Sequence, residues 1–152
     1  MLSAVKLTYI PLSLFRLMYK EQKRVSENLS STITHAYSTL QRPLSRAEYL
    51  LYHLDPPVPV TESSKLSDPE LLMAVLDTRE EIEEATSQDE VDRIKAQNQE
   101  KVDAAYQELI KAFSQGNAEA ARDKTIEYRY WLGLTKACDD WEPGKRVELV
   151  HD

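Results

Sequence analysis

Apolar residues spaced three and four positions apart recur along this 152-residue chain, and prolines separate the segments that carry them. Such spacing builds one apolar stripe along a helix, whereas the alternation of β-branched residues that marks strands is nearly absent. Only three glycines occur. Pro43 separates two helical patterns, because proline suits the first turn of a helix and not its interior. The chain is therefore predicted to be all-α.

Composition excludes several classes of function. The net charge of −7 argues against nucleic acid as a partner, since phosphate binding depends on clustered Lys and Arg. A single cysteine, Cys138, allows neither an internal disulfide nor a multi-cysteine metal site. No apolar run reaches the roughly 20 residues that a membrane-spanning helix needs. We therefore expect no nucleic-acid partner and no membrane span.

Two helices are predicted before a proline-rich connector. The first covers residues 19–40 and the second residues 45–54. Residues 55–66 contain three prolines and form a stiff linker. The expected apolar positions are Val25, Leu29, Ile33, Ala36, Tyr37 and Leu40 in the first helix, and Ala47, Leu50, Leu51 and Leu54 in the second. These two helices are too short to fold usefully alone and should rely on apolar surface from the rest of the chain.

Three further helices are predicted between residues 67 and 145. Ser67 and Glu70 form a capping box around Pro69, which opens a helix that runs to about residue 85. Ser87 repeats the start signal, and Gly116 ends the long helix that follows. Asn117 then caps the last helix. The expected buried face of the long helix consists of Val91, Ile94, Val102, Ala105, Tyr106, Leu109, Ile110 and Phe113. Short links of this kind predict an antiparallel three-helix bundle.

Residues 1–18 differ from the rest of the chain. They are apolar, lack acidic residues and carry Lys6 and Arg16. These properties are compatible with a segment that directs import into the mitochondrial matrix. They are equally compatible with a non-native start, and both interpretations stay open.

No arrangement of residues points to catalysis. The three histidines are scattered, the glycines do not form a phosphate-binding loop, and no acid–base or nucleophile pair stands out. Cys138 lies on a helix beside acidic residues and is expected to fill core space. We therefore predict that the protein is not an enzyme and that it holds no metal or cofactor.

The helix that follows Ser67 has an apolar arc wider than a small bundle needs. At 100° per residue, Leu71, Val75 and Ile82 share one narrow sector and are expected in the core. Leu72 and Leu76 fall to one side of that sector, one turn apart. An acidic row continues along this helix: Asp77, Glu80, Glu81 and Glu84. The two leucines are either a docking edge beside the acidic row or core residues packed against the last helix.

Two blocks of the chain resemble one known family. Residues 36–51 follow the pattern AY-x-x-L-x-x-P-L-x-R-A-x-Y-L-L, which is similar to the third and fourth helices of the J domain in HscB-type co-chaperones of iron–sulfur cluster assembly. LSDPELLMAVLDTREEIEE and the closing IEYRYWLGLTKACDDWEPGK resemble the C-terminal domain of the same family. The resemblance implies a partial J domain over residues 19–54, joined by the linker to a bundle over residues 67–145.

The resemblance also implies a binding site. The bundle of this family binds the scaffold protein on which iron–sulfur clusters are built. By matched position, the apolar docking residues are Leu72, Leu76 and Tyr130, and the flanking polar contacts are Asp77 and Glu80. Ala74 stands where some members have a lysine. A basic scaffold surface would be steered to the acidic row while the leucines supply the dehydrated centre.

The J domain of this family engages a DnaK-type ATPase chaperone through a His-Pro-Asp tripeptide. This chain has no such tripeptide, and Phe15-Arg16-Leu17-Met18 stands where it is expected. The resemblance therefore predicts a mitochondrial-matrix co-chaperone that binds the scaffold but does not stimulate the ATPase. The alternative is a helical adaptor or tether whose apolar edge binds an unrelated helix.

Overall fold

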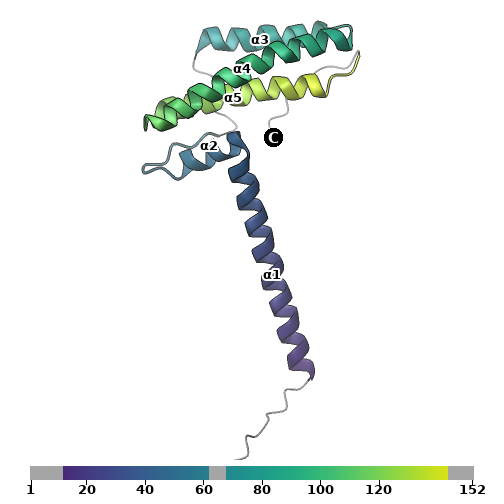
Figure 1. Ribbon diagram of the computed structural model, residues 1–152, viewed down its shortest axis with the longest axis vertical. Helices are drawn as coiled ribbons and strands as arrows, with labels where there is room; N and C mark the ends of the chain where they lie inside the picture. The colour runs from purple at the N-terminus through teal and green to yellow at the C-terminus, as the bar shows by residue number, and fades with distance from the viewer. Residues whose placement is uncertain (1–11, 62–67, 144–152) are drawn as a thin grey trace, which may run out of the picture. The chain divides into compact units, whose positions relative to one another are not determined.

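The computed structural model describes residues 12–61 and 68–143, and every regular element in these two ranges is a helix. The all-α prediction is confirmed. The helices are α1 (Leu12–Gln41), α2 (Pro43–Tyr52), α3 (Pro69–Glu84), α4 (Gln88–Ser114) and α5 (Ala118–Asp139), as Figure 1 shows. The chain divides into two compact units, Met1–Gln41 and Arg42–Asp152, and each is described by itself.

The first unit contributes the 30-residue helix α1. This helix begins at Leu12, earlier than the predicted residue 19, because no proline or glycine between residues 12 and 42 interrupts it. Its large apolar side chains from Val25 to Leu40 are exposed.

The second unit begins at the predicted break. Arg42 has an extended backbone and Pro43 occupies the first turn of α2, as expected for a proline. Ala47 and Leu51 are buried, and α2 packs against α5. Leu50 and Leu54 are not buried as predicted, because Leu50 lies to one side of the packed face and α2 ends before Leu54.

Packing groups α2 with the bundle, so the division between the two units falls after Gln41. The domain boundary predicted from sequence lies after Leu54 instead. The start of the linker also packs on the bundle, since Val58 and Val60 contact a cluster that contains Leu51. The Val58 N–H donates to the Leu51 carbonyl at 3.0 Å, and these contacts join the linker to α2.

The N-terminus of α3 is capped one residue later than predicted. The Asp68 carboxylate accepts a hydrogen bond from the Glu70 N–H at 2.9 Å, and Pro69 follows in the first turn. Asp68 therefore takes the role that the sequence assigned to Ser67, which lies outside the described residues. A carboxylate at this position is also favoured by the positive end of the helix dipole.

The turn between α3 and α4 is closed by Glu90. Its carboxylate accepts from the Thr86 N–H at 2.8 Å and from the Thr86 hydroxyl at 3.0 Å. These hydrogen bonds lower the pKa of Glu90. Ser87 is the N-cap residue by backbone position, although its side chain makes no capping hydrogen bond.

The turn between α4 and α5 follows the sequence prediction. Gly116 has a φ of +67°, the left-handed conformation that glycine adopts without strain. The Asn117 side chain accepts a hydrogen bond from the Ala120 N–H at 3.0 Å and caps α5. Both predictions are confirmed.

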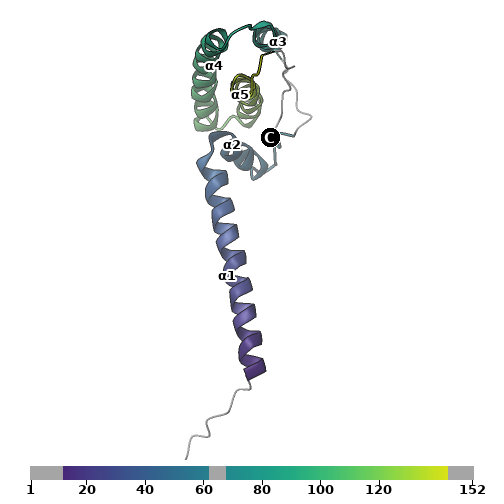
Figure 2. The same ribbon diagram turned by 90° about the vertical axis from the view of Figure 1, so that its right-hand side faces the viewer.

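Helix α5 is the central helix of the second unit, because it packs against α2, α3 and α4 (Figure 2). The main core combines residues from all of these helices: Ala47, Val75, Ile82, Val91, Val102, Ala105, Leu109, Tyr128, Trp131, Leu134, Ala137 and Cys138. Ile110 was predicted to be buried and is exposed instead. It lines a small apolar hollow between α2 and α4 together with Leu50.

A polar cluster joins α3 to the other two bundle helices. The Lys101 ammonium donates to the Thr78 hydroxyl at 3.0 Å and lies 4.7 Å from the centre of the Trp131 ring. Buried Asn98 donates from its Nδ2 to the Trp131 carbonyl at 2.9 Å and to the Thr135 hydroxyl at 2.8 Å. Since Thr78 is on α3, the Lys101 contact orients α3 about its own axis.

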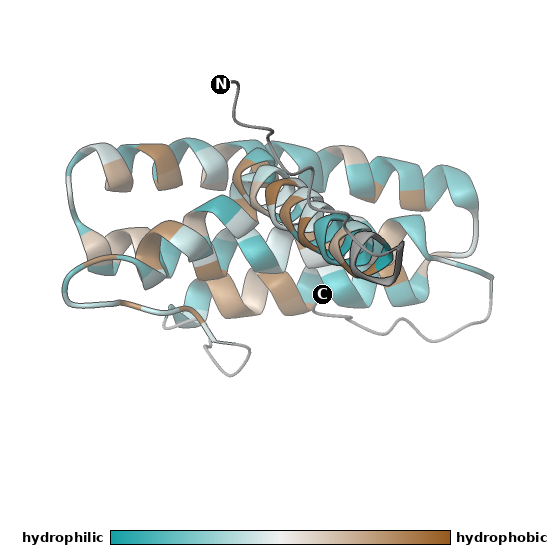
Figure 3. Ribbon diagram, turned by 90° about the horizontal axis from the view of Figure 1, so that it is seen from below, coloured by the Kyte–Doolittle hydropathy of each residue, from teal (hydrophilic) through white to brown (hydrophobic). Residues whose placement is uncertain are grey.

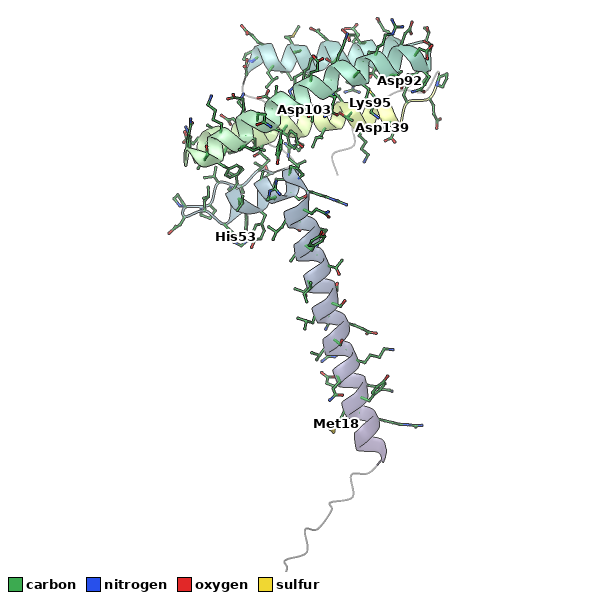
Figure 4. All side chains as sticks on the ribbon, viewed as in Figure 1. Met18, His53, Asp92, Lys95, Asp103 and Asp139 are labelled. Carbon is green, nitrogen blue, oxygen red and sulfur yellow. The ribbon has the colours of Figure 1, made fainter. Side chains whose placement is uncertain are left out.

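A surface ion pair joins the N-terminal part of α4 to the C-terminal end of α5. The Lys95 ammonium donates to the Asp139 carboxylate, and the two labelled side chains lie together in Figure 4. This hydrogen bond raises the pKa of Lys95.

Candidate interaction surface on α3

Helix α3 buries one apolar face and exposes another. Val75 and Ile82 are almost fully buried, and Leu71 packs against the same core, as predicted. Leu72 is 41% exposed and Leu76 is 47% exposed. The two leucines are therefore accessible to a partner, and the alternative that both are core residues is wrong.

Tyr130 lies on α5, the helix that packs against α3. Its side chain is half-buried and contacts the main core. Part of the ring remains accessible, which suits a residue that contributes to both a core and an interface. The prediction that Tyr130 joins Leu72 and Leu76 in one docking surface stays a prediction.

The predicted acidic row is exposed on α3. Asp77, Glu80, Glu81 and Glu84 all reach solvent, and none forms an ion pair with another residue in the described ranges. Among the residues that the structure describes, no cation neutralises these four carboxylates, so this side of α3 carries negative charge. Such a surface favours a partner with a complementary positive charge.

The acidic row ends at an open hollow between α3 and α4. The hollow has a volume of about 400 Å³, and its lining includes Glu81, Glu84, Arg93 and Ile94. Its lining is both polar and apolar, and Ile94 and neighbouring Ala85 are among its apolar residues. Leu72 and Leu76 do not line this hollow.

Sequence reasoning missed an ion pair that borders the two leucines. Arg79 Nε donates to Glu83 Oε1 at 3.0 Å. At 100° per residue, both side chains share the arc of α3 that carries Leu72 and Leu76. The four-residue spacing of opposite charges is the sequence signal that could have identified it. A partner that covers Leu76 also approaches this pair.

Chemistry other than binding has little support in the described parts of the chain. No three His, Cys, Asp or Glu side chains there are arranged to hold a metal ion. Cys138 is buried, and burial raises the pKa of its thiol to about 11, so the nucleophilic thiolate is disfavoured at neutral pH. Of the helices described, none is long and apolar enough to cross a membrane.

Comparisons with known proteins identify the family of this chain. Residues 67–139 match the family model described as the HSCB C-terminal oligomerisation domain. The chain is 36% identical over 126 residues to the mitochondrial J-type co-chaperone JAC1 of Saccharomyces cerevisiae, a match that covers 80% of this chain and 68% of that protein. This chain belongs to the HscB/Jac1 family of J-type co-chaperones.

Other members match over a smaller share of their length. The iron–sulfur cluster co-chaperone protein HscB of mouse is 29% identical over 113 residues, covering 74% of this chain and 48% of that protein. The mitochondrial J-type co-chaperone jac1 of Schizosaccharomyces pombe is 34% identical over 112 residues, covering 73% of this chain and 49% of that protein. The chain thus spans about half the length of these two members of the HscB/Jac1 family.

Solved structures of HscB/Jac1 proteins have the same fold. The Jac1 co-chaperone from Saccharomyces cerevisiae aligns with a TM-score of 0.71 at 34% identity, over 90% of this chain and 87% of that chain. The human co-chaperone protein HscB aligns with a TM-score of 0.69 at 22% identity, over 86% of this chain and 74% of that chain. At this identity the match supports the fold alone. These relatives are co-chaperones, in agreement with the interpretation of this chain as a non-enzyme.

Proposed function

We propose that this chain is a co-chaperone of iron–sulfur cluster biogenesis and that α3 carries its binding site for the cluster scaffold protein. The observation that supports this most directly is the exposure of Leu72 and Leu76 on a helix whose Val75 and Ile82 are buried. The mouse relative is named an iron–sulfur cluster co-chaperone, and the family model covers α3, α4 and α5. The position of the leucines and the family membership therefore support the same function.

The surface has the composition of a protein docking site. Leu72 and Leu76 supply an apolar centre that loses water when a partner covers it, and Tyr130 adds an aromatic side chain from α5. Asp77 and Glu80 border this centre and steer a basic partner toward it. The scaffold surface that binds here should carry apolar side chains within a basic rim.

Titration of the purified scaffold protein with this chain tests the proposal. Isothermal titration calorimetry should show saturable binding with a stoichiometry of one scaffold molecule per chain. Absence of measurable heat and of complex on a sizing column would contradict scaffold binding. An unrelated helical partner would then be the better candidate, as expected for an adaptor protein.

The acidic border should affect the rate of association more than the lifetime of the complex. The isosteric double variant Asp77→Asn with Glu80→Gln removes two charges and keeps both shapes. We expect the association rate constant at low salt to fall about 3- to 10-fold, because complementary charges mainly accelerate encounter. Biolayer interferometry at two ionic strengths measures this, and the variant should also show a weaker dependence on salt.

A control variant of equal charge change separates steering from net charge. Glu100→Gln with Glu108→Gln alters two exposed carboxylates on α4. This control should retain most of the native salt dependence. If both double variants behave alike, the acidic row has no specific part in docking.

We also propose that this chain binds the scaffold without stimulating a DnaK-type ATPase, because it contains no His-Pro-Asp tripeptide. The steady-state ATPase rate of the cognate chaperone should be unchanged by this chain, while a family member that has the tripeptide should raise it. With limiting scaffold, an excess of this chain should reduce the stimulation by that member through competition. Direct stimulation by this chain would contradict the proposal.

The proposed compartment is the mitochondrial matrix. Two relatives are named as mitochondrial proteins, the Jac1 proteins of the two yeasts. Protease protection of the expressed chain in isolated mitochondria, with and without permeabilised membranes, would test this assignment.

A further inference from the structure

Helix α3 carries more apolar surface than its buried face uses. Leu72 and Leu76 lie roughly 90° around the helix from the buried pair Val75 and Ile82. Figure 3 shows brown hydrophobic positions among teal hydrophilic ones along the helices, so an apolar position does not by itself reveal which face of a helix is buried. Burial of apolar surface is favourable, and on that ground alone α3 would turn its two exposed leucines toward the core. Another interaction must oppose this turn.

The hydrogen bond between Thr78 and Lys101 opposes it. Thr78 is 5% exposed and lies on the buried face of α3. The Lys101 ammonium donates to the Thr78 hydroxyl at 3.0 Å, and this hydroxyl donates to the Ala74 carbonyl at 2.9 Å. Side-chain atoms lie beyond the roughly 2.3 Å radius of the Cα atoms, so a turn of about 50° moves the hydroxyl by about 3 Å. A displacement of that size breaks the hydrogen bond to Lys101.

Lys101 is itself held by α5. Its half-buried ammonium lies 4.7 Å from the centre of the Trp131 ring, whose indole N–H donates to Glu127 at 3.5 Å. One turn earlier on α4, buried Asn98 donates to the Trp131 carbonyl at 2.9 Å. Among the residues that the structure describes, no carboxylate forms an ion pair with Lys101. Its cationic group therefore serves Thr78 and the Trp131 ring.

Lys101 also disfavours the packing in which the leucines are buried. A turn of about 100° replaces each residue of the buried face by the residue that follows it in sequence. Leu72 and Leu76 would then enter the core, and Arg79 would take the place of Thr78 beside Lys101. Two cations brought together in a half-buried site repel each other. One lysine thus stabilises the observed rotation of α3 and penalises the rotation that hides the leucines.

We infer that Lys101 is a positioning residue of the α3 docking surface: through Thr78 it holds α3 in the rotation that keeps Leu72 and Leu76 exposed. This inference rests on the proposed scaffold site. Lys101 acts through α3 and needs no contact with the scaffold. The apparent affinity of a protein falls with the population of its binding-competent state, so a variant that lets α3 turn should bind the scaffold more weakly.

Lys101→Met tests this role, because methionine keeps an unbranched apolar stem beside Trp131 and removes both the cation and the donor. A hydrogen bond from a charged group is strong enough to shift the rotation of α3 by about 10-fold or more. We expect scaffold affinity, measured by isothermal titration calorimetry, to fall by about 5- to 10-fold as the turned state becomes populated. Lys101→Arg keeps the charge and the N–H donors and should restore affinity to within about 2-fold of the wild type.

Lys95→Met is the matched control. Lys95 is also half-buried on α4, but it pairs with Asp139 on α5 and not with α3. This variant should bind the scaffold with native affinity. Native affinity in Lys101→Met overturns the inference, as does an equal loss in both methionine variants or a failure of Lys101→Arg to restore binding.

Thiol labelling measures the rotation of α3 without the scaffold. Val75→Cys places a thiol on the buried face of α3, where Val75 is 2% exposed, and native Cys138 on α5 is 3% exposed and reports general opening of the core. Adding Lys101→Met should accelerate labelling at position 75 by about 10-fold relative to labelling at Cys138. Equal acceleration at both positions would indicate a general loss of stability and overturn the inference.

The two measurements separate this inference from the proposed function. If the wild type binds the scaffold and Lys101→Met leaves labelling at position 75 unchanged, the proposed function stands and the role of Lys101 is overturned. If the wild type does not bind the scaffold, the proposed function fails together with the docking role, and labelling still decides whether Lys101 holds α3.

Discussion

The double variant Leu72→Ala with Leu76→Ala is expected to weaken scaffold binding by about 100-fold or more. Truncation of a central apolar anchor costs about 2 kcal/mol or more, and about 1.4 kcal/mol corresponds to a factor of ten in affinity. Both side chains are more than 40% exposed in the free protein, so their loss should affect the complex more than the fold. Isothermal titration calorimetry against the scaffold measures the change.

The matched control truncates two apolar residues of similar exposure elsewhere in the second unit. Leu50 is 43% exposed on α2 and Ile110 is 46% exposed on α4. The variant Leu50→Ala with Ile110→Ala should bind the scaffold with native affinity. Binding that survives the α3 double variant, or falls equally in both, would remove the α3 surface as the docking site.

Replacing Leu134 with alanine should cause the largest loss of stability among single substitutions considered for this chain. Leu134 is fully buried on α5, the helix that contacts α2, α3 and α4. Removing a buried leucine side chain loses its transfer free energy and leaves a cavity, at a cost of about 2–5 kcal/mol. Urea denaturation followed by circular dichroism should show a lower midpoint with a similar slope.

Leu76→Ala provides the comparison for Leu134→Ala, because it makes the same chemical change at an exposed position. Its free energy of unfolding should stay within about 0.5 kcal/mol of the wild type, as is usual for surface sites. A small effect at Leu134 would mean that α5 is not the centre of the core. A large effect at Leu76 would mean that this leucine supports the fold rather than a partner.

The helices and their turns were predictable because their signals are local. A proline at residue 43, a glycine at residue 116 and an asparagine cap at residue 117 act within one turn of the backbone. The predicted start of α1 at residue 19 was wrong, because a change in composition at residue 18 does not stop a helix when proline and glycine are absent. The predicted N-cap of α3 was wrong by one residue, because Asp68 is as good an N-cap residue as the neighbouring Ser67.

The burial of individual apolar residues was less predictable. Periodicity assigned Ile110 and Leu50 to buried faces, although both border a hollow between α2 and α4 and remain exposed. Periodicity identifies an apolar face. How much of that face a neighbouring helix covers depends on how the two helices pack. For the same reason, spacing alone could not decide between a core role and a surface role for Leu72 and Leu76.

By itself, the sequence determined the all-α class, the order of the helices and the family to which the chain is similar. These properties follow from apolar spacing, capping residues and matched sequence blocks, which are all read along the chain. Only the tertiary structure decided that α5 is the central helix, that α2 packs with the bundle, and that Leu72 and Leu76 remain exposed. Each of these depends on contacts between residues far apart in sequence, such as Thr78 with Lys101, which orient a helix about its axis and select the face that reaches solvent.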